Sequence, residues 1–255
     1  MRYFLAGLIL VIPLFAASDR PVPVIVELFT SEGCSSCPPA DRLLARLDQT
    51  QPVAGAQVIA LEEHVDYWNQ LGWMDPFSSA QYRARQNDYA IASHAKDIFT
   101  PQMVVNGQAA FVGSDSNRAY REIGAAAAEP STTLVTLATT PNAKDPDLLD
   151  LSVQVSNRGS AKWKKSNVYL AVTESGLSTF VSAGENSGHR LRHSAVVRSF
   201  GVIGHVDPKG ASGGQLVSTL RLPREWKREN LRAVVFVQER DTYRITGANA
   251  VDLHN

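Results

Sequence analysis

Apolar and polar positions alternate in blocks along the first part of the chain. Residues 24–29 form a short, apolar, β-branched run that is typical of a buried strand. Residues 40–47 carry apolar side chains at helical spacing, and Pro38-Pro39 suits a first helical turn because its missing N–H groups are not needed there. The segment Cys34-Ser35-Ser36-Cys37 lies between the two, so we expect both cysteines on a strand–turn–helix unit.

The pattern continues to about residue 128 in the order expected of a thioredoxin fold. It predicts a strand at residues 58–61, a helix over 78–95, strands at 102–105 and 109–112, and a helix that ends near residue 128. Asn106-Gly107, between the two short strands, is a dipeptide favoured in type I′ hairpin turns. Thr100-Pro101 stands just before the first of them, and the order of elements favours a cis bond there.

After residue 129 the pattern changes. Short segments rich in β-formers are separated by Gly, Asn, Ser and Pro, at residues 132–139, 149–155, 168–172, 195–202, 216–220 and 231–237. Such spacing indicates an antiparallel sandwich or barrel. We therefore predict an α/β thioredoxin-like domain over residues 22–129, followed by an all-β, sandwich-like domain over residues 130–255.

Residues 1–18 have the pattern of a signal peptide. A basic residue at position 2 precedes an apolar run over residues 3–15, and small residues follow at 16–18. The alternative is a retained membrane anchor, but the run is short for a hydrocarbon core of ~30 Å, and no later segment is long and apolar enough to span one. We expect a secreted or periplasmic protein that has no stable membrane insertion after cleavage.

The charge balance limits the class of partner. Lys and Arg number 25, Asp and Glu also number 25, and no basic run stands out, so nucleic acid is not an expected partner. We expect no cofactor. The expected partner is a protein thiol or disulfide, and the sequence leaves the oligomeric state open.

The two cysteines of the chain are only three positions apart. A disulfide that closes so small a ring stabilises a fold by about 2 kcal/mol in the chain-entropy account, so a purely structural role is weakly motivated. A cysteine at the start of a helix has its thiolate favoured by the helix dipole and by free N–H groups. We expect Cys34, as the more exposed of the two, to attack a substrate and Cys37 to resolve the mixed disulfide. The alternative is a passive disulfide.

Four residues are candidates for substrate binding. A cis bond at Pro101 would turn the Thr100 backbone toward the disulfide, where an extended substrate can pair with it as one more strand. An ordinary trans proline that opens an edge strand is the alternative. Trp68 and Trp73 belong to an aromatic-rich loop after the second strand, and they either line a peptide groove or pack inside the loop.

Two residues are candidates for proton transfer. Glu27 lies on the strand before the cysteines and is either a buried acid beneath them or a solvent-facing strand residue. His64 follows the second strand and could assist proton transfer or tune the thiolate, although a structural role is the commoner fate of a lone histidine.

In the second half, Arg190, Arg192 and the residues around them form either an anion or partner contact, or a solvated strand face.

Several long motifs resemble one family. The segment Glu27-Leu28-Phe29-Thr30-Ser31-Glu32-Gly33-Cys34-Ser35-Ser36-Cys37-Pro38-Pro39-Ala40-Asp41 is similar to a bacterial secreted thioredoxin-like family, domain of unknown function 1223. The other similar segments are His64-Val65-Asp66-Tyr67-Trp68, Leu71-Gly72-Trp73, Asp75-Pro76-Phe77, Thr100–Gly107 and Gly184-Glu185-Asn186.

The resemblance covers nearly all of the mature chain. It implies the thioredoxin-like fold, export and a two-part organisation, but no substrate. Gly33 replaces the aromatic residue usual before the first cysteine of thioredoxins, and Ser35-Ser36 replaces Gly-Pro. Because the redox potential depends on that dipeptide, the direction of electron flow stays open.

The leading hypothesis is an exported thiol–disulfide oxidoreductase that acts on extended protein substrates. A different class of protein, a soft-metal carrier, would bind copper through Cys34, Cys37 and His64 without turnover, since thiolate and imidazole suit that metal. A third possibility is a non-catalytic thioredoxin-fold scaffold, with a permanent disulfide and a β-domain that binds a partner.

Overall fold

The computed structural model describes residues 20–129, 131–159, 163–207 and 214–253, so the predicted signal peptide lies outside the described residues. The elements of the first half are β1 (Val22–Thr30), α1 (Pro38–Thr50), β2 (Ala56–His64), α2 (Ala80–Ala92), β3 (Gln102–Val105), β4 (Ala109–Val112) and α3 (Ser116–Ala128). Each of them lies where its sequence pattern predicted an element of that type.

The second half consists of strands. They are β5 (Thr133–Pro141), β6 (Leu148–Asn157), β7 (Ser166–Glu174), β8 (Leu177–Phe180), β9 (Arg190–His193), β10 (Val196–Val206), β11 (Gly214–Arg221), β12 (Leu231–Glu239) and β13 (Ile245–Asp252). Single turns of 3-10 helix lie at Asn69–Leu71 and Arg228–Asn230. No helix in the described part of the chain is long and apolar enough to cross a membrane.

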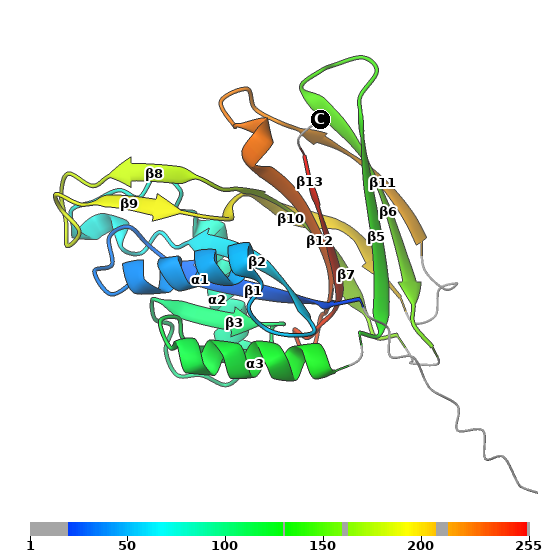
Figure 1. Cartoon of the computed structure of the whole chain (residues 1–255), viewed down its shortest axis with the longest axis horizontal. Helices are drawn as coiled ribbons and strands as arrows, with labels where there is room; N and C mark the ends of the chain where they lie inside the picture. The colour runs from blue at the N-terminus through cyan, green and yellow to red at the C-terminus, as the bar shows by residue number, and fades with distance from the viewer. Residues whose placement is uncertain (1–19, 130, 160–162, 208–213, 254–255) are drawn as a thin grey trace, which may run out of the picture.

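The predicted fold class is wrong. Strands from both halves form one mixed eight-stranded sheet in the order β13-β12-β7-β10-β2-β1-β3-β4 (Figure 1). The described residues contain about twice as much strand as helix and include three α-helices, so they do not form a helix-rich α/β thioredoxin domain followed by an all-β domain. The domain boundary at residues 129–130 stays a prediction.

The join between the halves explains the error. β10 pairs with β2 in parallel where Val196 lies beside Glu62, and β7 continues the sheet antiparallel to β10. The backbone N–H of Glu62 also donates to the carbonyl oxygen of Ala195, at 2.8 Å. Periodicity identifies strands, but it does not tell which strand occupies the edge of β2, because backbone pairing groups are the same at every residue.

The large sheet is covered on both faces. On one face it packs against α1 and α3 around β1, and against the three-stranded sheet β11-β6-β5 at the other end. The opposite face packs against α2, where Phe29 contacts Tyr89 edge to face. Because side chains alternate along a strand, Leu28 and Thr30 of β1 point toward α1, whereas Glu27 points toward α2.

The predicted hairpin turn is confirmed between β3 and β4. Asn106 and Gly107 have φ angles of 45° and 70°, and positive φ at both positions is the signature of a type I′ turn. The turn also contacts the second half of the chain, because the N–H of Ile245 donates to the carbonyl oxygen of Asn106 at 3.1 Å.

Candidate functional site

The two cysteines form a disulfide at the start of α1. Cys34 lies in the turn that follows β1, Cys37 is the N-cap of α1, and their Cα atoms are 5.4 Å apart. Both side chains are 0% exposed, so Cys34 is not the more exposed residue that we expected. Ser35 and Ser36, between the cysteines, are exposed and mark the side from which a partner can approach.

A segment from the second half of the chain covers the disulfide. This covering segment, Gly184-Glu185-Asn186, belongs to the β8–β9 hairpin, which lies beside α1 (Figure 1). The side-chain amide of Asn186 donates to the carbonyl oxygens of Glu32, at 2.8 Å, and Cys34, at 3.0 Å. The N–H of Ser35 donates to the Glu185 carboxylate at 2.9 Å. The resemblance singled out Gly184-Glu185-Asn186, but no sequence signal placed it over the cysteines.

The Thr100-Pro101 peptide bond is cis, as predicted. Trp68 links this bond to the cysteine segment, because its indole N–H donates to Thr100 Oγ1 at 2.8 Å while its Cβ lies against Gly33. A Cβ at Gly33 would lie 3.0 Å from that of Trp68, which accounts for glycine where thioredoxins carry an aromatic residue. Trp68 therefore positions the two segments that flank the disulfide.

Trp73 has a different partner. Its indole N–H donates to the Glu32 carboxylate at 2.8 Å, and its Cβ lies against Gly184. Glu32 is fully buried, so this bond satisfies a carboxylate that has no access to water. The half-buried Trp73 thus connects the covering segment to the acid beneath it.

His193, at the end of β9, lies in a buried cluster of charged groups next to the disulfide turn. Its Nδ1 donates to Glu62 at 2.8 Å and its Nε2 donates to Glu32 at 3.0 Å. Burial alone would lower the pKa of His193, but the Glu62 and Glu32 carboxylates raise it to about 9. Burial would likewise raise the pKa of Glu62, yet the imidazolium of His193 lowers it to about 2.

His64 belongs to the same cluster. Its Nδ1 donates to Asp75 at 2.7 Å, and its Nε2 lies 3.4 Å from Glu62 without a hydrogen bond. Burial opposes the charged form, but the Asp75 carboxylate holds the pKa of His64 well above its usual value. The rings of His64 and His193 meet edge to face, with their centroids 4.8 Å apart.

Asp41 is the buried acid on the helix that carries Cys37, and it was not among the candidates that the sequence suggested. It lies four residues after Cys37, hence on the same side of α1, and Thr30 donates to its carboxylate at 2.7 Å. Burial, reinforced by the charge of Glu62, raises the pKa of Asp41 to about 7. The helical spacing of Asp41 and Cys37 was the signal that could have revealed it.

Glu27 lies on the opposite face of the sheet from Asp41. Its carboxylate pairs with Arg85 at 2.5 Å and accepts a hydrogen bond from Tyr89. The Arg85 guanidinium is 4.8 Å from the ring centroid of Phe200, and it also stacks over Tyr89, Tyr169 and Phe236. The structure does not bring Glu27 to the disulfide.

Within the part of the chain that the structure describes, one group of residues could hold a metal ion. Glu62, His64 and His193 each offer one ligand atom, and these atoms lie within 4.8 Å of one another. The set contains no cysteine, so it differs from the predicted set of Cys34, Cys37 and His64. The three residues are also held by charged contacts with one another, with Glu32 and with Asp75, which accounts for their arrangement without an ion.

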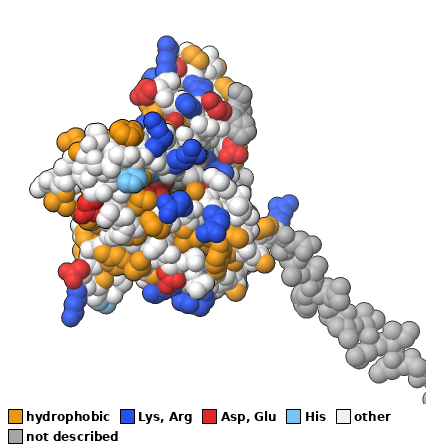
Figure 2. Space-filling view, turned by 60° about the vertical axis from the view of Figure 1, so that its left-hand side comes forward, with side chains coloured by type: hydrophobic (Ala, Val, Ile, Leu, Met, Phe, Trp, Pro, Cys, Tyr) orange, Lys and Arg blue, Asp and Glu red, His pale blue; other side chains and the backbone are white. Residues whose placement is uncertain are grey.

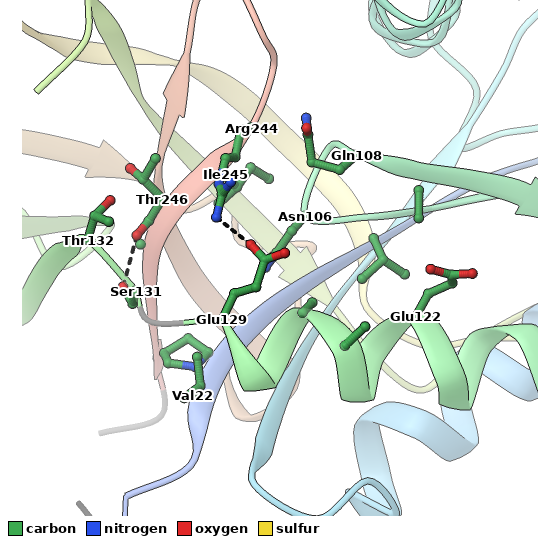
Figure 3. Close-up of a pocket in the computed structure, with 16 residues that line it drawn as sticks. Val22, Asn106, Gln108, Glu122, Glu129, Ser131, Thr132, Arg244, Ile245 and Thr246 are labelled. Carbon is green, nitrogen blue, oxygen red and sulfur yellow. Dashed lines mark hydrogen bonds and ion pairs between the residues drawn. The ribbon is translucent and has the colours of Figure 1, made fainter. Parts of the chain in front are cut away.

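A separate pocket lies at the far end of β1 from the disulfide (Figure 3). It is lined by residues of β1, the β3–β4 hairpin, α3 and β13, including Val22, Asn106 and Ile245. Its Glu129 and Arg244 form an ion pair. None of the residues of the disulfide site lines this pocket.

The pKa of His193 predicts how stability changes with pH. Because it rises from 6.5 to about 9 on folding, its contribution is fully present below pH 6.5 and is lost as the pH rises through about 9. The loss should reach about 3 kcal/mol. We expect urea unfolding of the wild type to show this loss between pH 6 and pH 10, and His193→Gln to show much less of it. His189→Gln, at an exposed position of the same hairpin, should behave as the wild type; an identical pH dependence in His193→Gln would contradict the assignment.

Comparisons with known proteins agree with the extent of the resemblance. A family model described as Protein of unknown function (DUF1223) matches residues 25–238. A crystal structure of a protein from Agrobacterium tumefaciens is similar at 26% identity, with a TM-score of 0.68, and the match covers 93% of this chain and 97% of that one. HBP35 of Porphyromonas gingivalis is similar in fold at 15% identity, with a TM-score of 0.61, over 91% of this chain and 76% of that one. No curated protein matches the chain.

Proposed function

The chain belongs to the family Protein of unknown function (DUF1223), and because that description assigns no activity, we propose from the site itself that it is an exported thiol–disulfide oxidoreductase. One observation carries the proposal. The Cys34–Cys37 disulfide lies at the start of α1, with the buried carboxyl group of Asp41 one helical turn beyond Cys37. This arrangement combines an exchangeable bond, a helix dipole that favours a thiolate, and a group that can hold a proton near neutral pH.

The exchange proceeds in two steps. A substrate thiolate attacks Sγ of Cys34, the Cys34–Cys37 bond breaks, and Cys37 leaves as a thiolate. A second substrate thiolate then attacks the substrate sulfur of the mixed disulfide and releases Cys34 as a thiolate. The substrate loses two electrons and gains a disulfide, and the protein gains the two electrons. The reverse sequence reduces a substrate disulfide.

Asp41 is suited to hold the proton that Cys37 exchanges. With a pKa of about 7 it is part protonated at neutral pH, so it can protonate the Cys37 thiolate on reduction and take the proton back on oxidation. The charge of Glu62 raises this pKa, whereas the charges of His193 and His64 lower it. Glu27 has no part in this step, since it faces α2.

The Thr100 backbone is suited to pair with an extended substrate. In the described part of the chain, its N–H and C=O form no hydrogen bond, and the residue is half-buried. Its side chain is held by Trp68, which also lies against Gly33. A substrate segment added here as a strand would therefore lie beside the cysteine turn.

The covering segment must move for exchange to occur. Asn186 and Glu185 bond to backbone atoms of the cysteine turn by three hydrogen bonds, and Cys34 is fully buried beneath them. Glu185 is exposed, so its bond to Ser35 competes directly with water. A substrate that offers its own donors and acceptors can replace these contacts.

Trapping the mixed disulfide tests the proposal. Cys37→Ser, expressed in its exporting host, should accumulate disulfide-linked protein adducts on Cys34, because the resolving thiol is missing. Non-reducing gels and mass spectrometry of the adducts provide the measurement. Cys34→Ser is the matched control and should form far fewer. If neither variant forms adducts, the disulfide is permanent and the protein is a scaffold.

Asp41→Asn tests the proton step. We expect the substitution to slow opening of the disulfide by a substrate thiol at pH 7 by about 100-fold, the lower end of what a positioned acid contributes. After correction for the thiolate fraction of the attacking thiol, the wild-type rate should fall as the pH rises through about 7, and the variant should lose this inflection. Asp88→Asn, at an exposed position of α2, serves as the control. An unchanged pH profile in Asp41→Asn would exclude this role.

A further inference from the structure

Four arginine side chains line a groove between α1 and the β8–β9 hairpin. Arg42 and Arg46 line it from α1, Arg190 and Arg192 line it from β9, and its volume is about 580 Å³. No Asp or Glu lines it. Figure 2 shows Lys and Arg side chains gathered near the middle of one face of the molecule.

These four arginines have no acidic partner among the described residues, and all four are exposed. Other arginines of the chain do pair, as Arg198 does with Glu174 at 2.9 Å. The whole chain has 25 basic and 25 acidic residues, so the excess is local to the groove. Like charges that converge from two elements repel one another, and a negative ligand between them relieves that repulsion.

The spacing of the arginines matches an extended peptide. Arg42 and Arg46 are one helical turn apart, which is about 6 Å along the axis. Arg190 and Arg192 lie two residues apart on a strand, which is about 7 Å. Carboxylates at every second position of an extended chain repeat at about 7 Å. This repeat is close to the spacing of the arginines along each wall of the groove, so successive carboxylates can each lie near an arginine. A single small anion would contact only some of the four arginines.

The groove begins near the disulfide. Arg42 is five residues beyond Cys37, or about 7.5 Å along α1, and His193 of the buried cluster also lines the groove. Resting on the proposed exchange activity, we infer that the groove binds an acidic, extended protein segment that flanks the substrate cysteine. The substrates are thus proteins with Asp or Glu at alternate positions near the reactive thiol.

Binding is measured with a probe that cannot exchange. A fluorescent eight-residue peptide of alternating Glu and Thr, without cysteine, should bind the oxidised full chain at least about tenfold more tightly than its Gln–Thr counterpart at low salt. R42Q/R46Q/R190Q/R192Q should abolish most of this difference. The matched control R118Q/R121Q/R221Q/R224Q removes the same charge from arginines that pair with acids elsewhere, and should keep the difference in affinity.

Three results would overturn the inference. They are equal affinity for the two peptides, an equal loss in the groove and control variants, and stronger binding to phosphatidylglycerol vesicles or inorganic phosphate than to the acidic peptide. Unfolding midpoints of both variants must match the wild type, and single substitutions R42Q and R190Q replace the quadruple variant if it does not fold.

Cysteine-containing versions of the two peptides separate this inference from the proposed function. Exchange with both peptides at equal rates would refute the acidic preference and leave the oxidoreductase activity intact. Tight binding of the acidic peptide without exchange would leave the groove intact and refute the activity.

Discussion

The buried hydrogen bonds of His193 hold the site together. They run from the end of β9, in the second half of the chain, to Glu62 at the end of β2 and to Glu32 in the turn before Cys34. Loss of one partner from such a buried charged set costs about 3–5 kcal/mol, because the remaining charges lose their compensation. The position of the covering segment, the acids near the disulfide and the arginine groove all depend on where this histidine places the β8–β9 hairpin.

Local features of the site were predictable from the sequence. The strand before the cysteines, the helix after them, the hairpin at Asn106-Gly107 and the cis bond at Pro101 each follow from residues that are close together in the chain. The family also followed from contiguous motifs. Such features depend on backbone preferences and side-chain periodicity, which a single sequence displays directly.

The rest depends on contacts between distant segments. The pairing of β10 with β2 joins residues more than 130 positions apart, and it places strands of both halves in one sheet. The same pairing brings His193 to Glu62, so the charged cluster could not be inferred from either segment alone. Glu27 failed as a candidate acid because alternation along β1 turns it toward Arg85, while Asp41 on α1 occupies the face of the cysteines.

The central claim is that the Cys34–Cys37 disulfide exchanges reversibly in the folded protein. Equilibration of the native chain with reduced and oxidised glutathione, followed by alkylation and mass spectrometry, measures this directly. The account predicts a two-electron couple with a potential between about −270 and −120 mV, the range of exchanging dithiols. A bond that stays oxidised until the chain unfolds, with a potential below about −300 mV, would contradict it and mark the disulfide as structural.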